Sequence, residues 1–119
     1  MGRPWPNEVR LRSKEKVFEI DFEDGQTFAF PAEFLRIQSP SAEMRGHGTG
    51  PGKLIGGRRH VGILKVEPVG NYAVRLHFDD LHDTGLYSWA YLYELGLDQD
   101  ARWRHYLAAL EERGFNRDP

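Results

Sequence analysis

The feature that most constrains the fold is an alternation of apolar and polar residues that leads into a tight turn. Residues 17–22 alternate with the period of two that is typical of a half-buried strand. Asp24-Gly25 predicts a hairpin, because glycine accepts the positive φ that tight turns require. Pro31 lacks a backbone N–H and can open a short helix over residues 32–37. The pattern therefore predicts a hairpin that runs directly into a helix.

A second strand-rich region follows later in the chain. Residues 63–69 predict a strand with Leu64 and Val66 on one face. Pro68 indicates that this strand ends there or lies at a sheet edge. The remaining elements, in order, are a strand at residues 74–78, an acidic loop at 79–83, a returning strand at 84–88 and a helix at 89–95 that Gly96 ends.

The two regions echo one another. Residues 20–24 match residues 76–80, and residues 28–35 match residues 85–92 once the longer second turn is allowed for. Two such units can pack about a pseudo-two-fold axis, while the alternative is that any strand–turn–strand–helix gives a similar pattern. We expect an α+β fold, with a small antiparallel sheet built from two pseudo-repeated hairpin–short helix units.

A final helix is predicted over residues 98–114. Asp98 can cap its first turn and Gly114 can end it. A length of 119 residues suits one domain with one core, so we expect a single domain over residues 1–119 with its core at 7–97. The apolar residues of the helix recur at helical spacing and predict one buried face: Trp103, Tyr106, Leu107 and Leu110.

Composition excludes several classes of function. The formal net charge of −2 gives no basic footprint for nucleic acid and no polybasic patch for a membrane surface. The chain has no cysteine, which excludes disulfides, thiolate zinc sites, a cysteine nucleophile and thiolate ligation of an iron–sulfur cluster. No segment approaches the ~20 apolar residues of a membrane span, and no apolar run follows Met1 as in a secretory signal. We therefore expect a cytoplasmic protein.

Residues 38–57 predict a long loop that contains six glycines. Loops of this length inside a compact domain are commonly functional or disordered. Several basic side chains give this loop a positive charge that suits an acidic partner or an anion, and we call it the binding loop. They are Arg45, His47, Lys53, Arg58 and Arg59.

This loop does not fit a phosphate-binding P-loop. Lys53 follows a glycine, but the P-loop pattern requires glycine six residues before the lysine and serine or threonine after it. His47 and Leu54 stand at those places. We exclude a nucleotide site of that type.

Two sets of side chains resemble metal sites. The first set resembles the two-histidine, one-carboxylate triad of non-haem iron oxygenases and consists of His77, Asp79 and His105. The catalytic folds of those oxygenases are larger barrels, so a solvated strand face explains these residues better. Oxygen donors also gather around one imidazole in the acidic loop, where they could hold a divalent cation, although an ordinary acidic hairpin loop is the more common structure. The candidates for this residual metal site are Asp79, Asp80, His82 and Asp83.

No set of residues indicates catalysis. Ser39 and Ser41 flank Pro40, and neither has a local base or a nucleophile-elbow pattern. Hydrogen bonding at a helix end and in a turn explains both serines better. We therefore expect that the chain is not an enzyme and needs no cofactor.

Three runs of residues carry a resemblance to a known family. They are FLRIQSPSAE at residues 34–43, VGILKVEPVGNYA at 61–73 and FDDLHDTGLYSWAYL at 78–92. They strongly resemble the gamma-butyrobetaine hydroxylase-like N-terminal domain family, a domain of unknown function, in its bacterial stand-alone form. The similarity covers roughly residues 7–97.

The resemblance implies a zinc site that this chain has lost. In full hydroxylases of the family, three cysteines and a histidine hold a structural zinc beside a separate iron- and 2-oxoglutarate-dependent catalytic domain. Serine and methionine are poor zinc ligands, so we expect no metal at these positions. The degenerate positions in this sequence are Ser39, Ser41, Met44 and His82.

The resemblance also implies partners. The module is found fused to a P-loop ATPase of the iron–sulfur cluster carrier type, which favours a non-catalytic adaptor that assists iron–sulfur protein maturation. The alternative is a metal-binding accessory domain of an iron/2-oxoglutarate-dependent oxygenase system. A third possibility is a detached regulatory or dimerising domain for such an oxygenase, with Trp5, Trp89 and Trp103 at the interface, although core packing explains at least two of them better. We expect a protein partner, an iron–sulfur carrier ATPase or an oxygenase, and neither nucleic acid nor a membrane.

Overall fold

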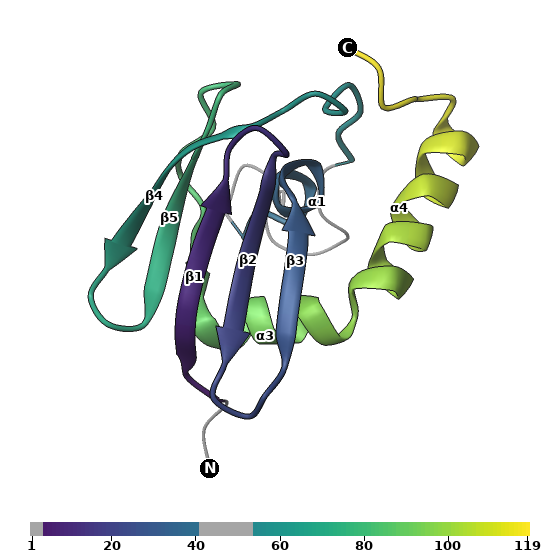
Figure 1. Ribbon diagram of the computed structural model, residues 1–119. Coiled ribbons are helices and arrows are strands. Elements are labelled where there is room, and N and C mark those ends of the chain that lie inside the picture. The colour runs from purple at the N-terminus through teal and green to yellow at the C-terminus, as the bar shows by residue number, and fades with distance from the viewer. Residues whose placement is uncertain (1–3, 41–53) are drawn as a thin grey trace.

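The computed structural model describes residues 4–40 and 54–119. These residues form two antiparallel three-stranded sheets and three helices, which confirms the predicted α+β class (Figure 1). The two hairpin–helix units form separate sheets rather than one continuous sheet. No helix in the described ranges is long and apolar enough to cross a membrane.

The first sheet has the order β1-β2-β3. It consists of β1 (Pro6–Arg12), β2 (Val17–Phe22) and β3 (Thr27–Pro31). Gly25 has φ +92° in the turn between β2 and β3, as the predicted hairpin requires. Helix α1 (Ala32–Ile37) begins directly after β3, with Pro31 at the N-cap position. The predicted hairpin and its helix are confirmed.

The second sheet has the order β4-β5-β6 and is also followed by a helix. The strands are β4 (Ile63–Val69), β5 (Ala73–Phe78) and β6 (Leu86–Ser88), and the helix is α3 (Trp89–Leu97). Strand β4 lies at the edge of this sheet, which explains how it tolerates Pro68.

The prediction that Leu64 packs on the same face as Val66 is wrong. The pairing of β4 with β5 shifts between Ile63 and Lys65, so an extra residue bulges out of β4. A bulge reverses the alternation of faces locally. Leu64 is therefore 67% exposed, while Ile63 is buried.

The prediction that Gly96 ends the helix at residues 89–95 is also wrong, because α3 continues to Leu97. A Cβ atom built on Gly96 would lie 2.4 Å from the ring of Phe28, which comes from β3. Glycine is needed there because it lets the helix approach the sheet closely.

The returning strand also begins later than predicted, at Leu86 rather than at residue 84.

Helix α4 (Gln99–Arg113) ends as predicted, with Gly114 in the left-handed conformation at φ +72°. The Asp98 side chain makes no capping bond; it accepts a hydrogen bond from Arg102 Nε at 3.0 Å instead. Tyr106 and Leu110 are buried, but Leu107 is exposed, so the predicted apolar face is wrong at that residue. Helix α4 runs along the β3 side of the molecule (Figure 1).

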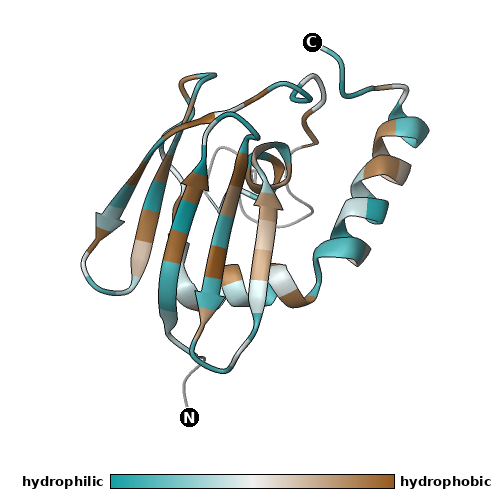
Figure 2. Ribbon diagram, viewed as in Figure 1, coloured by the Kyte–Doolittle hydropathy of each residue, from teal (hydrophilic) through white to brown (hydrophobic). Residues whose placement is uncertain are grey.

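The core is formed by alternate residues of the strands together with the inner faces of α1 and α3. Figure 2 shows this alternation along the strands, with apolar and polar positions succeeding one another in β2. The Tyr87 hydroxyl crosses the core and donates to the Leu35 carbonyl at 2.5 Å, which joins β6 to α1. The largest fully buried side chains are Tyr87, Phe18, Phe22, Phe30, Phe34, Phe78, Ile20, Leu35, Leu76, Leu92, Leu95 and Val74.

Candidate functional site

The candidate site is a cluster of polar side chains at the junction of the two units. It lies where the end of α1 meets the loop between β5 and β6. Arg36, Ser39 and His82 are only 6%, 4% and 6% exposed, so each depends on partners within the protein. Asp80 and Arg58 complete the group, which we call the junction cluster.

Ser39 and His82 are the centre of the junction cluster. Ser39 Oγ and His82 Nε2 share a buried hydrogen bond of 2.9 Å. The His82 backbone is fixed as well, because its N–H donates to Asp80 Oδ1 at 3.2 Å and its carbonyl accepts from the Phe78 N–H at 3.0 Å. A Cβ on Gly85 would lie 2.5 Å from Ser39 Oγ, so the sequence needs glycine opposite this bond.

Asp80 joins three segments of the chain through two guanidinium groups. Its Oδ2 lies 2.8 Å from Arg36 Nε and 2.8 Å from Arg58 Nε. Burial alone would raise the pKa of Asp80, but the hydrogen bonds from Arg36 and the His82 N–H, with the charges of both arginines, outweigh it and lower the pKa. Asp80 is thus held as a carboxylate between α1, the β5–β6 loop and the segment before β4.

Tyr87 closes the inner side of the cluster. Its ring is fully buried, and burial raises the pKa of the hydroxyl well above its ordinary value. The phenol therefore stays protonated and keeps donating to the carbonyl of Leu35. This hydrogen bond fixes the position of α1 relative to β6.

Leu81 stands between the two anchored residues of the loop. It has φ +72°, a left-handed conformation that L side chains rarely adopt, and it is 86% exposed. Its N–H donates to the Phe78 carbonyl at 3.1 Å, which closes the tight turn. Asp79 and Asp83 on either side are exposed too. The loop thus presents an apolar tip between acidic neighbours.

The basic residues predicted for the binding loop are used in different ways. Arg58 pairs with Asp80, and Arg59 Nε lies 2.6 Å from Asp118 Oδ1. The other predicted residues of this loop and of the degenerate zinc site, Arg45, His47, Lys53, Ser41 and Met44, lie outside the described residues.

The triad-like residues do not converge. His77 Nε2 lies 2.9 Å from Glu67 Oε1, across the β4–β5 pair, and its other nitrogen lies 3.9 Å from Asp83 Oδ2. His105 is exposed on α4, and Asp79 is exposed in the β5–β6 loop. Within residues 4–40 and 54–119, no group of three or more histidine, cysteine or acidic side chains is arranged to hold a metal ion.

The zinc that the family resemblance implies does not fit the donors described at this place. Of the four degenerate positions, Ser39 and His82 are brought into direct contact. A serine hydroxyl is a poor zinc ligand, and Asp80 is engaged by two guanidinium groups. The described donors therefore form a hydrogen-bonded cluster that joins α1 to the β5–β6 loop.

The sequence interpretation missed Arg36 and the ion pairs of Asp80. Helix α1 reads AEFLRI, so Glu33 and Arg36 are charged residues in a short apolar helix, and both are buried. Buried charges require partners, which was the available signal. Their partners lie far away in the sequence: Asp80 for Arg36, and Arg117 for Glu33.

The tryptophans considered for an interface divide into two kinds. Trp89 and Trp103 are partly buried and pack against the core, in agreement with the core-packing interpretation. Trp5 is 50% exposed at the start of the described chain.

The family model described as "Gamma-butyrobetaine hydroxylase-like, N-terminal" matches residues 9–93. No curated protein matches the chain. Solved structures that resemble the chain include the following three. One NMR solution structure shares 45% identity, covers 99% of this chain and 93% of its own, and has a TM-score of 0.87. A second NMR structure shares 45% identity over 98% of this chain and 87% of its own, with a TM-score of 0.84.

The third similar structure is a crystal structure from Acidithiobacillus ferrooxidans. That protein has unknown function and is described as a member of the DUF971 family. It shares 38% identity, covers 76% of this chain and 91% of its own, and has a TM-score of 0.65.

Proposed function

The chain belongs to the gamma-butyrobetaine hydroxylase-like N-terminal family, and on that premise we propose that it is a non-catalytic binding module, an adaptor that docks on a protein partner. The role is proposed for the cytoplasm, because a chain without cysteine suits a reducing compartment. The observation that carries the proposal is Leu81, an apolar side chain that is 86% exposed and held at φ +72°.

A strained and exposed leucine is unfavourable in the isolated protein. The left-handed conformation costs about 1–2 kcal/mol for a residue with a Cβ atom, and the side chain gains nothing from burial. Strain of this kind concentrates at functional sites, where the surrounding structure enforces it. A partner that covers Leu81 would recover the apolar burial that the free protein lacks.

The junction cluster holds Leu81 in this strained conformation. Asp80, just before Leu81, is held by two arginines, and His82, just after it, is held by Ser39. The tip is therefore fixed before any partner arrives, and a fixed contact loses less conformational entropy on binding. In this proposal the buried polar groups position the apolar tip and take no part in chemistry.

We propose that the partner is an iron–sulfur cluster carrier of the P-loop ATPase type, the context that the family resemblance implies. A chain with no cysteine offers no thiolate to a cluster, so its contribution would be to dock the protein that holds one. Asp79 and Asp83 flank Leu81, which suits an apolar pocket with basic residues at its rim.

Binding of the purified full chain to a purified carrier ATPase of this type, measured by isothermal titration calorimetry, tests the proposal. We expect Leu81→Gly to weaken binding about tenfold or more, as for a central interface residue. Leu97→Ser removes another exposed leucine, 57% exposed at the end of α3, and should change the affinity by less than about twofold. An unmodified chain that does not bind would refute the carrier as the partner.

The second candidate function is a metal-binding accessory domain of an oxygenase system. The observation that favours it is that His82 lies in a loop with Asp79, Asp80 and Asp83. Elemental analysis of the purified protein tests it directly. One equivalent of iron or zinc that is lost on His82→Ala would establish this function in place of the adaptor.

A further inference from the structure

The two hairpin–helix units repeat one another down to their irregularities. Each forms a three-stranded antiparallel sheet that is followed directly by a helix. The pairing of β1 with β2 shifts between Pro6 and Glu8, and the pairing of β4 with β5 shifts between Ile63 and Lys65. In both units the residue before the shift pairs with the last residue of the central strand. Bulges are specific features of a fold, so the same bulge in both units shows that β1 corresponds to β4.

The turns that follow the two central strands are also equivalent. In the first unit, Asp24 Oδ1 accepts a hydrogen bond from the Gln26 N–H at 3.0 Å. In the second unit, Asp80 Oδ1 accepts one from the His82 N–H at 3.2 Å. The same local hydrogen bond therefore closes both turns.

Each turn is held by the helix of the other unit. The Tyr93 hydroxyl of α3 donates to Asp24 Oδ2 at 2.5 Å, and Arg36 Nε of α1 donates to Asp80 Oδ2 at 2.8 Å. A pseudo-two-fold arrangement requires such an exchange, because each unit then contacts the other at the same place. Residues of the two units can accordingly be compared position by position.

The second unit carries leucine at two positions where the first does not. The bulge residue is Asn7 in β1 and Leu64 in β4. The middle residue of the turn is Gly25 in the first unit, with φ +92°, and Leu81 in the second, with φ +72°. Glycine adopts this conformation without strain, so the turn itself does not call for leucine. The two leucines are 67% and 86% exposed, so neither is needed to fill the core.

Leu64 and Leu81 lie at the same end of the second sheet. Leu64 follows Ile63, which pairs with Phe78 at the end of β5. The Leu81 N–H donates to the carbonyl of the same Phe78 at 3.1 Å. The two leucines thus flank one residue pair, and exposed apolar side chains that gather in one place mark binding surfaces.

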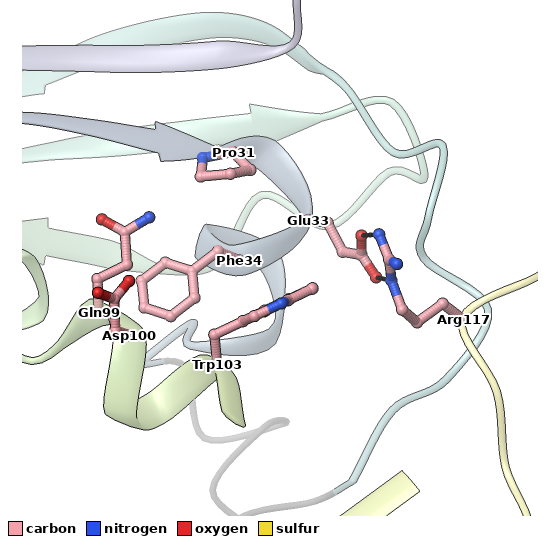
Figure 3. A pocket seen from close by; sticks show the side chains of 7 residues that line it. All are labelled: Pro31, Glu33, Phe34, Gln99, Asp100, Trp103 and Arg117. Atoms are coloured by element: carbon pink, nitrogen blue, oxygen red, sulfur yellow. Dashed lines mark hydrogen bonds and ion pairs between the residues drawn. The ribbon is translucent and has the colours of Figure 1, made fainter. Parts of the chain in front are cut away.

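Helix α4 belongs to neither unit and packs on the first. Trp103 of α4 meets Phe34 of α1 edge to face, with ring centroids 6.5 Å apart. Beyond the helix, Arg117 donates to both carboxylate oxygens of Glu33 at 2.8 and 2.7 Å (Figure 3). The helix of the first unit is therefore covered by the chain itself. Within the described ranges no element covers the two leucines of the second unit in this way, as their exposure shows.

We propose that Leu64 and Leu81 form one docking surface, an inference that rests on the proposed function and extends it from a single tip to a two-point contact. The occupant is the carrier ATPase, which covers both leucines with one apolar patch. Asp79 and Asp83 are exposed on either side of Leu81, so charge complementarity places basic residues of the partner at that side of the patch. The first unit does not dock in the same way, because asparagine and glycine stand at its equivalent positions.

Isothermal titration calorimetry of the full chain with the purified carrier ATPase tests this by exchanging the two bulge residues. Leu64→Asn gives β4 the bulge residue of β1 and should weaken binding about threefold or more, as for an apolar residue inside an interface. Asn7→Leu is the matched control: it gives β1 the bulge residue of β4 and should change the affinity by less than about twofold. Urea denaturation checks that both variants remain folded.

A second measurement needs no variant. In methyl NMR spectra of the unmodified chain, the resonances of both Leu64 and Leu81 should shift when the carrier binds. The methyl resonances of Leu97, the exposed leucine at the end of α3, should not.

Three results distinguish the shared surface from the adaptor role. Leu81→Gly that weakens binding while Leu64→Asn does not would overturn the surface and leave the adaptor role in place. Equal effects of Leu64→Asn and Asn7→Leu, or a Leu64 methyl resonance that does not move in the complex, would do the same. Failure of the unmodified chain to bind would refute the carrier as the partner, and this surface with it.

Discussion

Ser39 on the segment after α1 and His82 in the β5–β6 loop share a buried hydrogen bond of 2.9 Å, although they are 43 residues apart in the chain. This bond connects the first hairpin–helix unit to the second. Asp80 adds a charged connection beside it, through Arg36 of α1. The two units are therefore joined at this point by a buried hydrogen bond and an ion pair.

Removing the Ser39 hydroxyl should destabilise the protein. Ser39→Ala leaves one hydrogen-bonding position of the buried His82 ring without its partner hydroxyl, which costs about 1–3 kcal/mol of the free energy of unfolding. Urea denaturation measures the change. Ser13→Ala, in the exposed turn between β1 and β2, is the control and should stay within about 0.5 kcal/mol. Equal effects of the two substitutions would contradict the importance of the bond.

Replacing Leu81 should stabilise the free protein even as it weakens partner binding. Leu81→Gly relieves a left-handed conformation worth about 1–2 kcal/mol, against about 0.5–1 kcal/mol of added chain entropy in the unfolded state. We expect a modest rise in Tm by calorimetry. Leu64→Gly is the matched control: it also removes an exposed leucine, but from β4, where glycine weakens a strand, so Tm should fall.

Adding one methyl group at Gly96 should disturb the packing of α3 on the first sheet. The new Cβ of Gly96→Ala would lie 2.4 Å from the Phe28 ring, so the helix or the ring must move, at a cost of about 1–3 kcal/mol. The near-ultraviolet circular dichroism should change together with the urea midpoint. Ala90→Ser, an exposed position on the same helix, should leave both unchanged. A neutral Gly96→Ala would show that this close contact is easily relaxed.

Much of the fold follows from local patterns in the sequence. The alternation at residues 17–22, the Asp24-Gly25 turn and the residues of α1 were all predicted correctly, because each depends on neighbouring residues. The bulge at Leu64 was not predicted, because its position depends on how β4 pairs with β5 and not on the residues next to it in the sequence. Gly96 was misread because glycine allows both a helix end and a close contact.

The candidate site was predictable only in part. Ser39 and His82 were singled out through the family resemblance, and the structure brings them together. The ion pairs of Arg36 with Asp80 and of Arg117 with Glu33 span 44 and 84 residues, and no local pattern indicates pairing over such distances. The strain at Leu81 is likewise a property of the folded loop, and leucine gives no sequence signal for positive φ.

Acid should loosen the junction cluster through Asp80. Its pKa is lower in the folded protein than in the unfolded chain, so the carboxylate contributes stability that is present above the unfolded pKa, about 4. This contribution to stability is lost as the pH falls through the pKa that Asp80 has in the folded protein, which lies below its pKa in the unfolded chain. The Asp80→Asn variant has no carboxylate at this position, so protonation of Asp80 cannot destabilise it. At pH 7 this variant should be less stable than the unmodified chain, because Arg36 loses its buried partner.

Urea midpoints between pH 7 and pH 2 measure this effect. Several other carboxylates also have lowered pKa values, among them Glu19, Asp21 and Glu67, so both proteins should lose stability in acid. The unmodified chain should lose more, and the gap between the two curves should narrow below about pH 4 as Asp80 is protonated. Parallel curves over the whole range would mean that Arg36 and Arg58 do not hold Asp80 as a carboxylate in solution.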